Sequence, residues 1–336
     1  MAEKYSECRS TKKRGTHMNS AQIKEKADLL KANMEKVIVG KGPVIELVLT
    51  ALLAQGHVLL EDVPGTGKTM LAKSLARSVA TDFKRIQFTP DLLPGDLIGI
   101  NYYNQKEGEF TFREGALFTN VLLADEINRA TPRTQAALLE SMEERQVTVD
   151  GVTYPLARPF FVIATQNPIE TQGTFPLPEA QLDRFLMKLS LGYTDRAETV
   201  EILKRFIGGA PLEEVSPVLT AEELVAMQEA VKQVYVHPDL AAYSAALCER
   251  TRTGDQILMG ASTRGNLALI RAAQALAAIR GRDYILPDDL KELANPVLGH
   301  RIILRGTLKS RQNQVQSLLE AIVGEVPVPT ESWTKA

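Results

Sequence analysis

The chain has 336 residues, 44% of them hydrophobic and 24% charged, which is typical of a globular protein of about two domains. Its 39 Lys and Arg residues are balanced by 41 Asp and Glu residues, so no overall basic excess indicates nucleic acid or an anionic membrane as a partner. Cys8 and Cys248 are the only cysteines and lie far apart, which excludes a disulfide framework and fits a reducing compartment. No run approaches the roughly 20 apolar residues of a membrane span, and we expect a cytoplasmic protein.

The first 18 residues carry five basic side chains against two acidic ones and have no apolar stretch that could form the core of a signal peptide. We interpret residues 1–18 as a mobile basic tail or, because Met18 is an alternative start, as an upstream extension. Helical spacing of apolar residues predicts helices over 20–36 and 43–54. These helices lead into a short apolar strand at 57–61.

A glycine-rich loop follows this strand, and an amphipathic helix begins near Thr69. Backbone N–H groups of such a loop converge on an anion at a helix N-terminus. Lys68 would reach the terminal phosphates of a nucleotide, and the Thr69 hydroxyl would bind Mg²⁺. The strict G-x-x-x-x-G-K-[ST] pattern has glycine where this chain has Asp62, but P-G-T-G-K-T still lies between a strand and a helix. The predicted phosphate-binding residues are Pro64, Gly65, Thr66, Gly67, Lys68, Thr69 and Met70.

Further strands are predicted where short apolar runs end in turns, and helical stretches separate most of them. These strands cover residues 84–89, 120–126, 159–167 and 185–191. Such alternation implies parallel pairing and a sheet covered on both faces, which is the α/β class. Beyond about residue 194 the strand signals stop, and helical periodicity marks 195–206, 220–234, 238–250, 264–280 and 287–298. We therefore predict an α/β nucleotide-binding core over 19–193 and a mainly helical lid domain over 194–330.

Two segments break this alternation and predict inserted β-hairpins. In residues 98–115 a polar turn separates two aromatic-rich arms. In residues 145–156 the pair Asp150 and Gly151 lies between alternating valines, which is typical of a two-residue hairpin loop. Each hairpin is either a solvated decoration or a device that engages a partner.

Two more polar groups follow predicted core strands. Asp125 and Glu126 end the strand V-L-L-A-D-E, and the carboxyl ends of parallel strands face the ligand crevice. Asp125 would then lie across the Mg²⁺ from Thr69, and Glu126 would activate the attacking water; alternatively, the two carboxylates cap the helix that begins near residue 131. Asn167 ends the next strand, where a neutral amide can hold the water or the γ-phosphate, or can simply form a turn before Pro168. No N-K-x-D guanine signature occurs at this position, so ATP is the expected nucleotide.

In this order P-G-T-G-K-T, L-L-A-D-E, A-T-Q-N-P, the segment 178–185 and the segment 260–266 resemble an AAA+ ATPase. More closely, residues 88–99, 122–144 and 164–185 are similar to the MoxR family, bacterial and archaeal ATPases regarded as chaperone-like maturation factors. The resemblance covers most of residues 20–325. It implies a P-loop AAA+ core with a parallel sheet and two inserted β-hairpins, followed by a helical lid.

The resemblance also implies roles for single residues. Asn167 takes the sensor-1 role, Arg184 is the arginine finger and Arg264 takes the sensor-2 role on the lid. Family members often have Ser-Pro-Arg where this chain has Ser262, Thr263 and Arg264, so the arginine is kept.

Two further assignments concern the adenine and the finger. Val39 and Gly40 of V-I-V-G-K are expected near the adenine, although Lys41 stands where Gln is more usual. Arg129 and Arg133 stay open as alternative fingers.

The sequence thus predicts an ATP-hydrolysing machine that uses ATP and Mg²⁺. The resemblance implies a homo-oligomeric ring, most simply a hexamer, that remodels or matures protein complexes with a von Willebrand A-domain protein and a client protein. Assistance in metal or cofactor insertion, as in magnesium-chelatase-like complexes, is a variant of this role.

Two other functions are less favoured. A DNA translocase shares the same inserts, but a hairpin that grips a strand needs Lys or Arg at its tip. The tip at 148–152 is acidic and apolar, and the other tip pairs Lys106 with Glu107 and Glu109, so nucleic acid is an unlikely partner. A switch that binds nucleotide without turnover is disfavoured by the intact pair of Asp125 and Glu126.

Overall fold

The computed structural model describes residues 18–168, 173–305 and 311–329, so the predicted tail up to residue 17 lies outside the described part of the chain. The first helix begins where Asn19 and Gln22 form a reciprocal capping box. The helices are α1 Ser20–Glu35, α2 Gly42–Leu53, α3 Lys68–Ser78, α4 Pro94–Ile98, α5 Pro132–Glu144, α6 Glu179–Leu182, α7 Arg196–Gly208, α8 Ala221–Val231, α9 Pro238–Arg250, α10 Thr263–Ile279, α11 Pro287–Leu298 and α12 Arg311–Glu325, with short 3₁₀ turns η1 Ile127–Arg129, η2 Pro211–Glu214 and η3 Gly299–Arg301. The strands are β1 Val58–Glu61, β2 Phe83–Gln87, β3 Ile100–Asn104, β4 Glu109–Arg113, β5 Val121–Asp125, β6 Gln146–Val149, β7 Val152–Pro155, β8 Phe161–Gln166, β9 Met187–Leu189, β10 Ile257–Met259 and β11 Ile303–Leu304.

A five-stranded sheet forms the centre of the molecule, in the order β2-β5-β8-β1-β9, and every neighbouring pair is parallel. These are the five core strands that the sequence predicts, and the α/β class is confirmed. Along β5, Leu122 and Ala124 point into one apolar cluster and Leu123 into the other. This period of two buries both faces of the strand, which explains its continuous apolar run.

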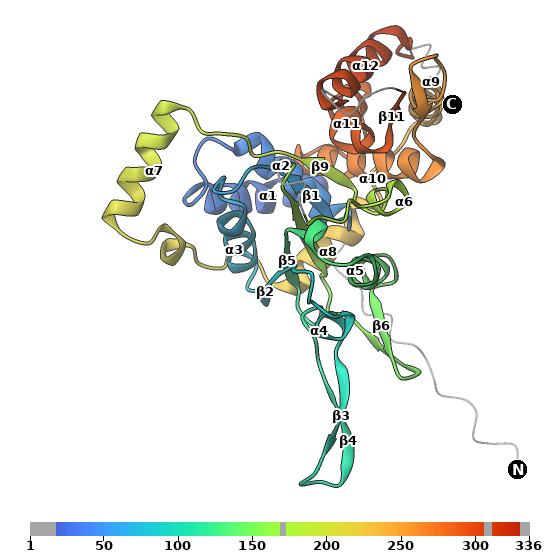
Figure 1. Cartoon of the computed structure of the whole chain (residues 1–336). Helices are drawn as coiled ribbons and strands as arrows, with labels where there is room; N and C mark the ends of the chain where they lie inside the picture. The colour runs from blue at the N-terminus through green and yellow to red at the C-terminus, as the bar shows by residue number, and fades with distance from the viewer. Residues whose placement is uncertain (1–17, 169–172, 306–310, 330–336) are drawn as a thin grey trace, which may run out of the picture.

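Helices cover both faces of the sheet (Figure 1). The apolar cluster on the face of Leu123 includes α1, α2 and α3, whereas the cluster on the face of Leu122 includes α5 and the residues around α4. Because the strands are parallel, all five carboxyl ends lie at one edge of this sandwich and all five amino ends at the other.

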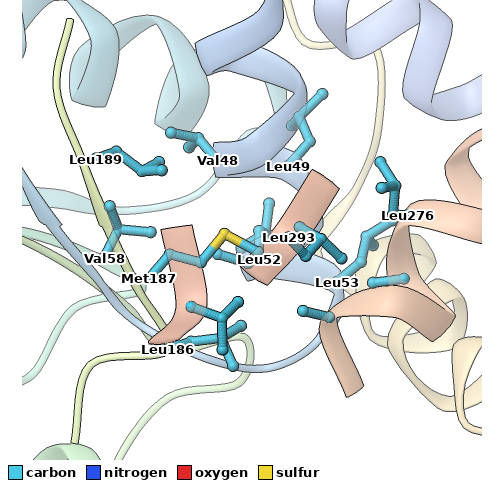
Figure 2. Close-up of a cluster of buried hydrophobic side chains, with 14 of the residues drawn as sticks. Val48, Leu49, Leu52, Leu53, Val58, Leu186, Met187, Leu189, Leu276 and Leu293 are labelled. Atoms are coloured by element: carbon cyan, nitrogen blue, oxygen red, sulfur yellow. The ribbon is translucent and has the colours of Figure 1, made fainter. Parts of the chain in front are cut away.

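The C-terminal helices share the core of the sheet domain. Figure 2 shows Leu276 of α10 and Leu293 of α11 beside the apolar residues of α2, β1 and β9. Both leucines are fully buried. The buried cluster therefore runs without interruption from the sheet into the helical region, and fixes where the lid helices lie relative to the strands.

The helical region contains two features that the sequence prediction missed, a short pair of strands and the last helix. β10 and β11 pair antiparallel, so the prediction of a mainly helical lid is confirmed but this pair of strands was missed. The two strands are only three and two residues long. The paired residues lie more than 40 positions apart in the chain, and strands this short contain no periodic pattern of apolar residues. Helix α12 was not predicted either.

Both predicted hairpins are present, formed by β3 with β4 and by β6 with β7. At the tip of the second, Asp150 and Gly151 have φ angles of +50° and +82°, as a two-residue loop of this kind requires. The Asn101 side chain donates to the Asp150 carboxylate over 2.7 Å. The rings of Phe112 and Tyr154 stack 4.2 Å apart, so the two hairpins support each other at this contact. The β3–β4 arm extends well beyond the body of the molecule (Figure 1).

Helix α7 stands away from the sheet, at the left of Figure 1, and has no buried residue. Arg205 anchors it by donating to the carbonyls of Glu35 and Lys36 at the end of α1, over 2.7 and 2.8 Å. None of the helices in the described ranges is long and apolar enough to cross a membrane.

Candidate active site

The phosphate-binding loop joins β1 to α3 and has the backbone that its glycines permit. Gly65 and Gly67 adopt φ angles of +86° and +93°, and no atom lies within 4 Å of the position that a Cβ would take on either residue. Lys68 opens α3, and its ammonium group donates to the carbonyls of Asp62 and Val63 over 2.9 and 3.3 Å. The loop therefore offers open backbone, a helix N-terminus and a cation to an anionic ligand.

Asp62 explains the departure from the usual glycine pattern. The residue is 5% exposed, and its carboxylate accepts hydrogen bonds from the Ser190 hydroxyl, the Leu191 N–H and the Gly192 N–H over 2.7, 2.7 and 3.0 Å. These donors take up the negative charge. The same contacts fasten the loop to the segment that leaves β9 toward the lid.

The predicted adenine segment meets that same stretch of chain. The Lys41 ammonium donates to the Tyr193 carbonyl over 2.8 Å and lies 3.5 Å from the Glu198 carboxylate. Gly40 has a φ of +74°, and a Cβ there would lie only 1.8 Å from a Glu198 oxygen. Residues 190–193 thus lie between the phosphate-binding loop and the segment that carries Val39 and Gly40, and bring the two halves of the predicted nucleotide site together.

The acidic pair lies at the carboxyl edge of the sheet, as predicted. The Asp125 carboxylate accepts from the Thr165 hydroxyl over 2.6 Å and from the Arg85 guanidinium over 2.7 Å. The Thr165 hydroxyl in turn accepts from the Glu126 N–H over 2.8 Å. Side chains of β2 and β8, on the two sides of β5, therefore hold the end of that strand.

Glu126 is held by both its backbone and its side chain. Its backbone lies in the left-handed region at φ +56°, which is uncommon outside glycine and is concentrated at functional sites. One carboxylate oxygen accepts from Gln87 over 2.7 Å and pairs with Arg129 over 2.8 Å. Its position beyond β5 is thus set by backbone and side chain together.

Sequence reasoning missed Arg85, Gln87 and Thr165. A signal was present for Gln87, since it ends β2 as Asp125 ends β5, and the two are paired in register. It could be used only once β2 was known to lie beside β5, because chain order alone does not give strand order.

Asn167 follows β8 directly and is 6% exposed, which places it at the same edge as Glu126. The oxygen donors at this edge fit a magnesium ion. The Thr69 hydroxyl on the first turn of α3 and the Asp125 carboxylate are the hard oxygen ligands that Mg²⁺ prefers.

Arg184 lies at the opposite edge of the sheet. It follows α6 and precedes β9, and two residues further on the Leu186 N–H donates to the carbonyl of His57, just before β1. The four residues of β1 separate this edge from the phosphate-binding loop by about 13 Å along the strand. No residue in the described ranges accepts a hydrogen bond from the Arg184 guanidinium or forms an ion pair with it. Burial lowers the pKa of nearby His57 to about 4, so this imidazole is neutral at pH 7.

Arg264 lies at that same amino edge. Its guanidinium is 3.1 Å from the Glu143 carboxylate near the end of α5. Two residues after Glu143, the Arg145 guanidinium donates to the carbonyl of Gln55, just ahead of β1. Within one chain the predicted set therefore divides into the loop, the acidic pair and Asn167 at the carboxyl edge, and Arg184 and Arg264 at the amino edge.

The parallel sheet, the phosphate-binding loop after β1, the acidic pair after β5 and the amide after β8 define a P-loop ATPase of the AAA+ class. Residues 57–187 match the model of the ATPase family associated with various cellular activities (AAA), and residues 249–322 match that of the AAA lid domain.

Relatives narrow the class further. Chaperone MoxR1 of Mycobacterium tuberculosis is 42% identical over 305 residues, which cover 88% of this chain and 80% of that protein. Protein MoxR of Methylorubrum extorquens is 33% identical over 319 residues, which cover 88% of this chain and 92% of that protein. The crystal structure of a proposed ATPase from Cytophaga hutchinsonii aligns with a TM-score of 0.85 at 40% identity, covering 93% of this chain and 97% of that one. The chain belongs to the MoxR family of AAA+ ATPases.

Proposed function

We propose that this protein hydrolyses ATP to ADP and phosphate in a Mg²⁺-dependent reaction, at sites shared between neighbouring copies in a ring, most simply a hexamer. The observation that carries this proposal is the separation of Arg184 from the phosphate-binding loop of its own chain. A half-buried guanidinium with no partner in the described chain is available to a second copy.

The residues at the carboxyl edge bind the substrate and handle its water. The loop N–H groups and Lys68 neutralise the phosphate charge of ATP. Thr69 and Asp125 would hold a Mg²⁺ ion, which when bound neutralises charge on the β- and γ-phosphates. Glu126 accepts a proton from the attacking water, and Asn167 holds that water or the γ-phosphate. Gln87 fixes the Glu126 carboxylate from the neighbouring strand.

Arg184 completes the site from the adjacent subunit. A guanidinium is permanently cationic and presents its donors as a planar fork, which suits the charge that develops on a transferring phosphoryl group. Arg264 lies at the same edge and would reach the same neighbour. Arg129, the main alternative as finger, instead pairs with Glu126 of its own chain.

ATP turnover would drive remodelling of a client protein. The support is the relative named Chaperone MoxR1 and the long β3–β4 arm, on which Tyr102, Tyr103 and Phe110 are exposed. We further propose a cytoplasmic protein that works with a von Willebrand A-domain partner, with assistance in metal or cofactor insertion as a variant of this role.

Mixing two inactive variants tests the shared site. Lys68→Ala subunits keep the finger and lose the phosphate-binding lysine, while Arg184→Ala subunits keep that lysine and lose the finger. In a randomly mixed ring about one interface in four joins an intact loop to an intact finger, so turnover should recover to about a quarter of the wild-type value.

The matched control mixes Arg129→Ala with Lys68→Ala, and its turnover should not exceed the mean of the two variants measured separately. If well-exchanged mixtures of Lys68→Ala and Arg184→Ala stay as inactive as either variant alone while the Arg129→Ala mixture recovers, the finger is Arg129 and the proposed interface is wrong.

A further inference from the structure

A buried arginine from the lid reaches into the segment that carries the finger. Arg301 ends η3 and its side chain is 3% exposed. Its guanidinium donates to the Asp183 carboxylate over 2.6 Å and to the carbonyls of Asp183, Phe185 and Leu186 over 3.0, 2.7 and 3.2 Å. A further hydrogen bond goes to the carbonyl of Val297, at the end of α11. The backbone on both sides of Arg184 is therefore held by one side chain of the lid.

These bonds fix the direction in which Arg184 leaves the chain. The carbonyls of Asp183 and Phe185 flank the Arg184 residue, and the Phe185 side chain next to it is fully buried. The guanidinium fork is rigid, so several acceptors held at once leave the backbone little freedom to rotate. A displacement of about 1 Å in a positioning group can cost roughly 100-fold in rate, so this restraint matters for a group that must meet a phosphoryl group.

The Arg301–Asp183 pair is also linked to the start of α10. The second oxygen of Asp183 accepts from the Ser262 hydroxyl over 3.3 Å, and Ser262 caps the helix that carries Arg264. Burial lowers the pKa of Arg301, and the Asp183 carboxylate raises it again. Opposing effects of this kind are expected for a buried charge that is paired with an opposite charge.

We propose that Arg301 is a positioning residue for Arg184: it locks the finger segment to the lid, so that the placement of the lid sets the hydrolysis rate in the neighbouring subunit. The inference rests on the proposed role of Arg184 and adds a residue that touches neither ATP nor the loop of its own chain.

The test compares Arg301→Lys with Arg184→Ala and with their double variant. Arg301→Lys keeps the charge and loses the fork, so kcat should fall about tenfold while the Kd for ATP changes less than twofold. In the Arg184→Ala background the same substitution should have no further effect on kcat, because the group that it positions is already absent.

Mixed rings distinguish a loss of finger positioning from a general loss of folding or activity in the Arg301→Lys subunit. Arg301→Lys subunits should regain turnover with Lys68→Ala subunits, which supply an intact finger, and should gain none with Arg184→Ala subunits. Asp183→Asn removes the ion pair with Arg301 and leaves the hydrogen bonds from Arg301 to the carbonyls. It should complement in the same mixtures as Arg301→Lys, with a smaller loss of kcat. It provides a second variant if Arg301→Lys does not fold.

Arg282→Lys is the matched control. It removes a fork that holds the buried Asp289 within the lid, over 2.6 and 2.8 Å, without any contact to residues 183–186. Its kcat should stay within about twofold of the wild-type value.

Three results would overturn the inference. They are an unchanged kcat in both Arg301→Lys and Asp183→Asn, an additive loss of kcat when Arg301→Lys is combined with Arg184→Ala, or an equal loss of kcat in Arg282→Lys. If Lys68→Ala and Arg184→Ala themselves fail to complement, the proposed shared site is at fault instead, so the two failures are distinguishable.

Discussion

Asp62 shows how one residue can serve the phosphate-binding loop without touching phosphate. An acid beside an anion site is unfavourable by Coulomb repulsion, but three donors from residues 190–192 take up its charge. Its role is therefore to tie the loop to the connection between β9 and α7.

Replacing Asp62 with Ala should lower the free energy of unfolding by about 1–3 kcal/mol, since the buried Leu191 N–H would lose its acceptor. Asp62→Asn keeps an acceptor oxygen and should lose less. Urea unfolding of the two variants beside the wild type measures both values. An Asp62→Ala protein as stable as the wild type would contradict the anchoring role.

Residue roles could be predicted from sequence where a local pattern fixes them. The loop, the acidic pair and Asn167 all follow apolar strands directly, and parallel pairing brings strand ends to one edge. The contacts of Arg85, Gln87 and Thr165 depend on which strands are neighbours. Those of Asp62 and Arg301 depend on segments more than 100 residues away in the chain, so no local pattern carries them.

At the scale of elements, the hairpin of β6 and β7 gives a test of what the inserts do. Asp150 and Gly151 both have positive φ, and Asp150 also accepts from Asn101 of the other hairpin. Replacing Gly151 with Ala strains the turn by about 1 kcal/mol, and replacing Asp150 with Ala removes the link to Asn101. Basal ATP turnover should stay within about twofold, whereas stimulation of turnover by a client should fall strongly.

The comparison needs both rates from the same preparation, with Thr148→Ala, two positions before Asp150 on β6, as a control. Equal loss of basal and stimulated turnover in the Asp150 and Gly151 variant would assign the hairpin a purely structural role.

Helices and strands could be predicted from the sequence where apolar residues recur with a regular period. The five core strands and both hairpins are found as expected. The pairing of β10 with β11 has no such period. For α12 a signal was present, because Val315, Leu319 and Ile322 recur at helical spacing and are buried.

At the scale of the whole molecule, the proposed mechanism assigns the two halves of one reaction to the two edges of the sheet. The carboxyl edge has the loop and Glu126, the amino edge has Arg184 and Arg264, and the lid is tied to the second edge through Arg301 and Asp183. Head-to-tail contact between copies would bring the halves together, and such heterologous contacts close into rings when the rotation permits. The sequence could indicate a ring only through family resemblance, because no periodic pattern reports how copies meet.

The most direct test of ATP hydrolysis at the carboxyl edge is the rate of phosphate release by Glu126→Gln at saturating ATP. Glutamine has nearly the same shape but cannot accept the proton of the water, so ATP binding should persist while kcat falls at least about 100-fold. Lys68→Ala, measured beside it, should instead lose ATP binding. Phosphate release by Glu126→Gln at the wild-type rate would contradict the assignment of the base, and with it the account of this edge as the site of hydrolysis.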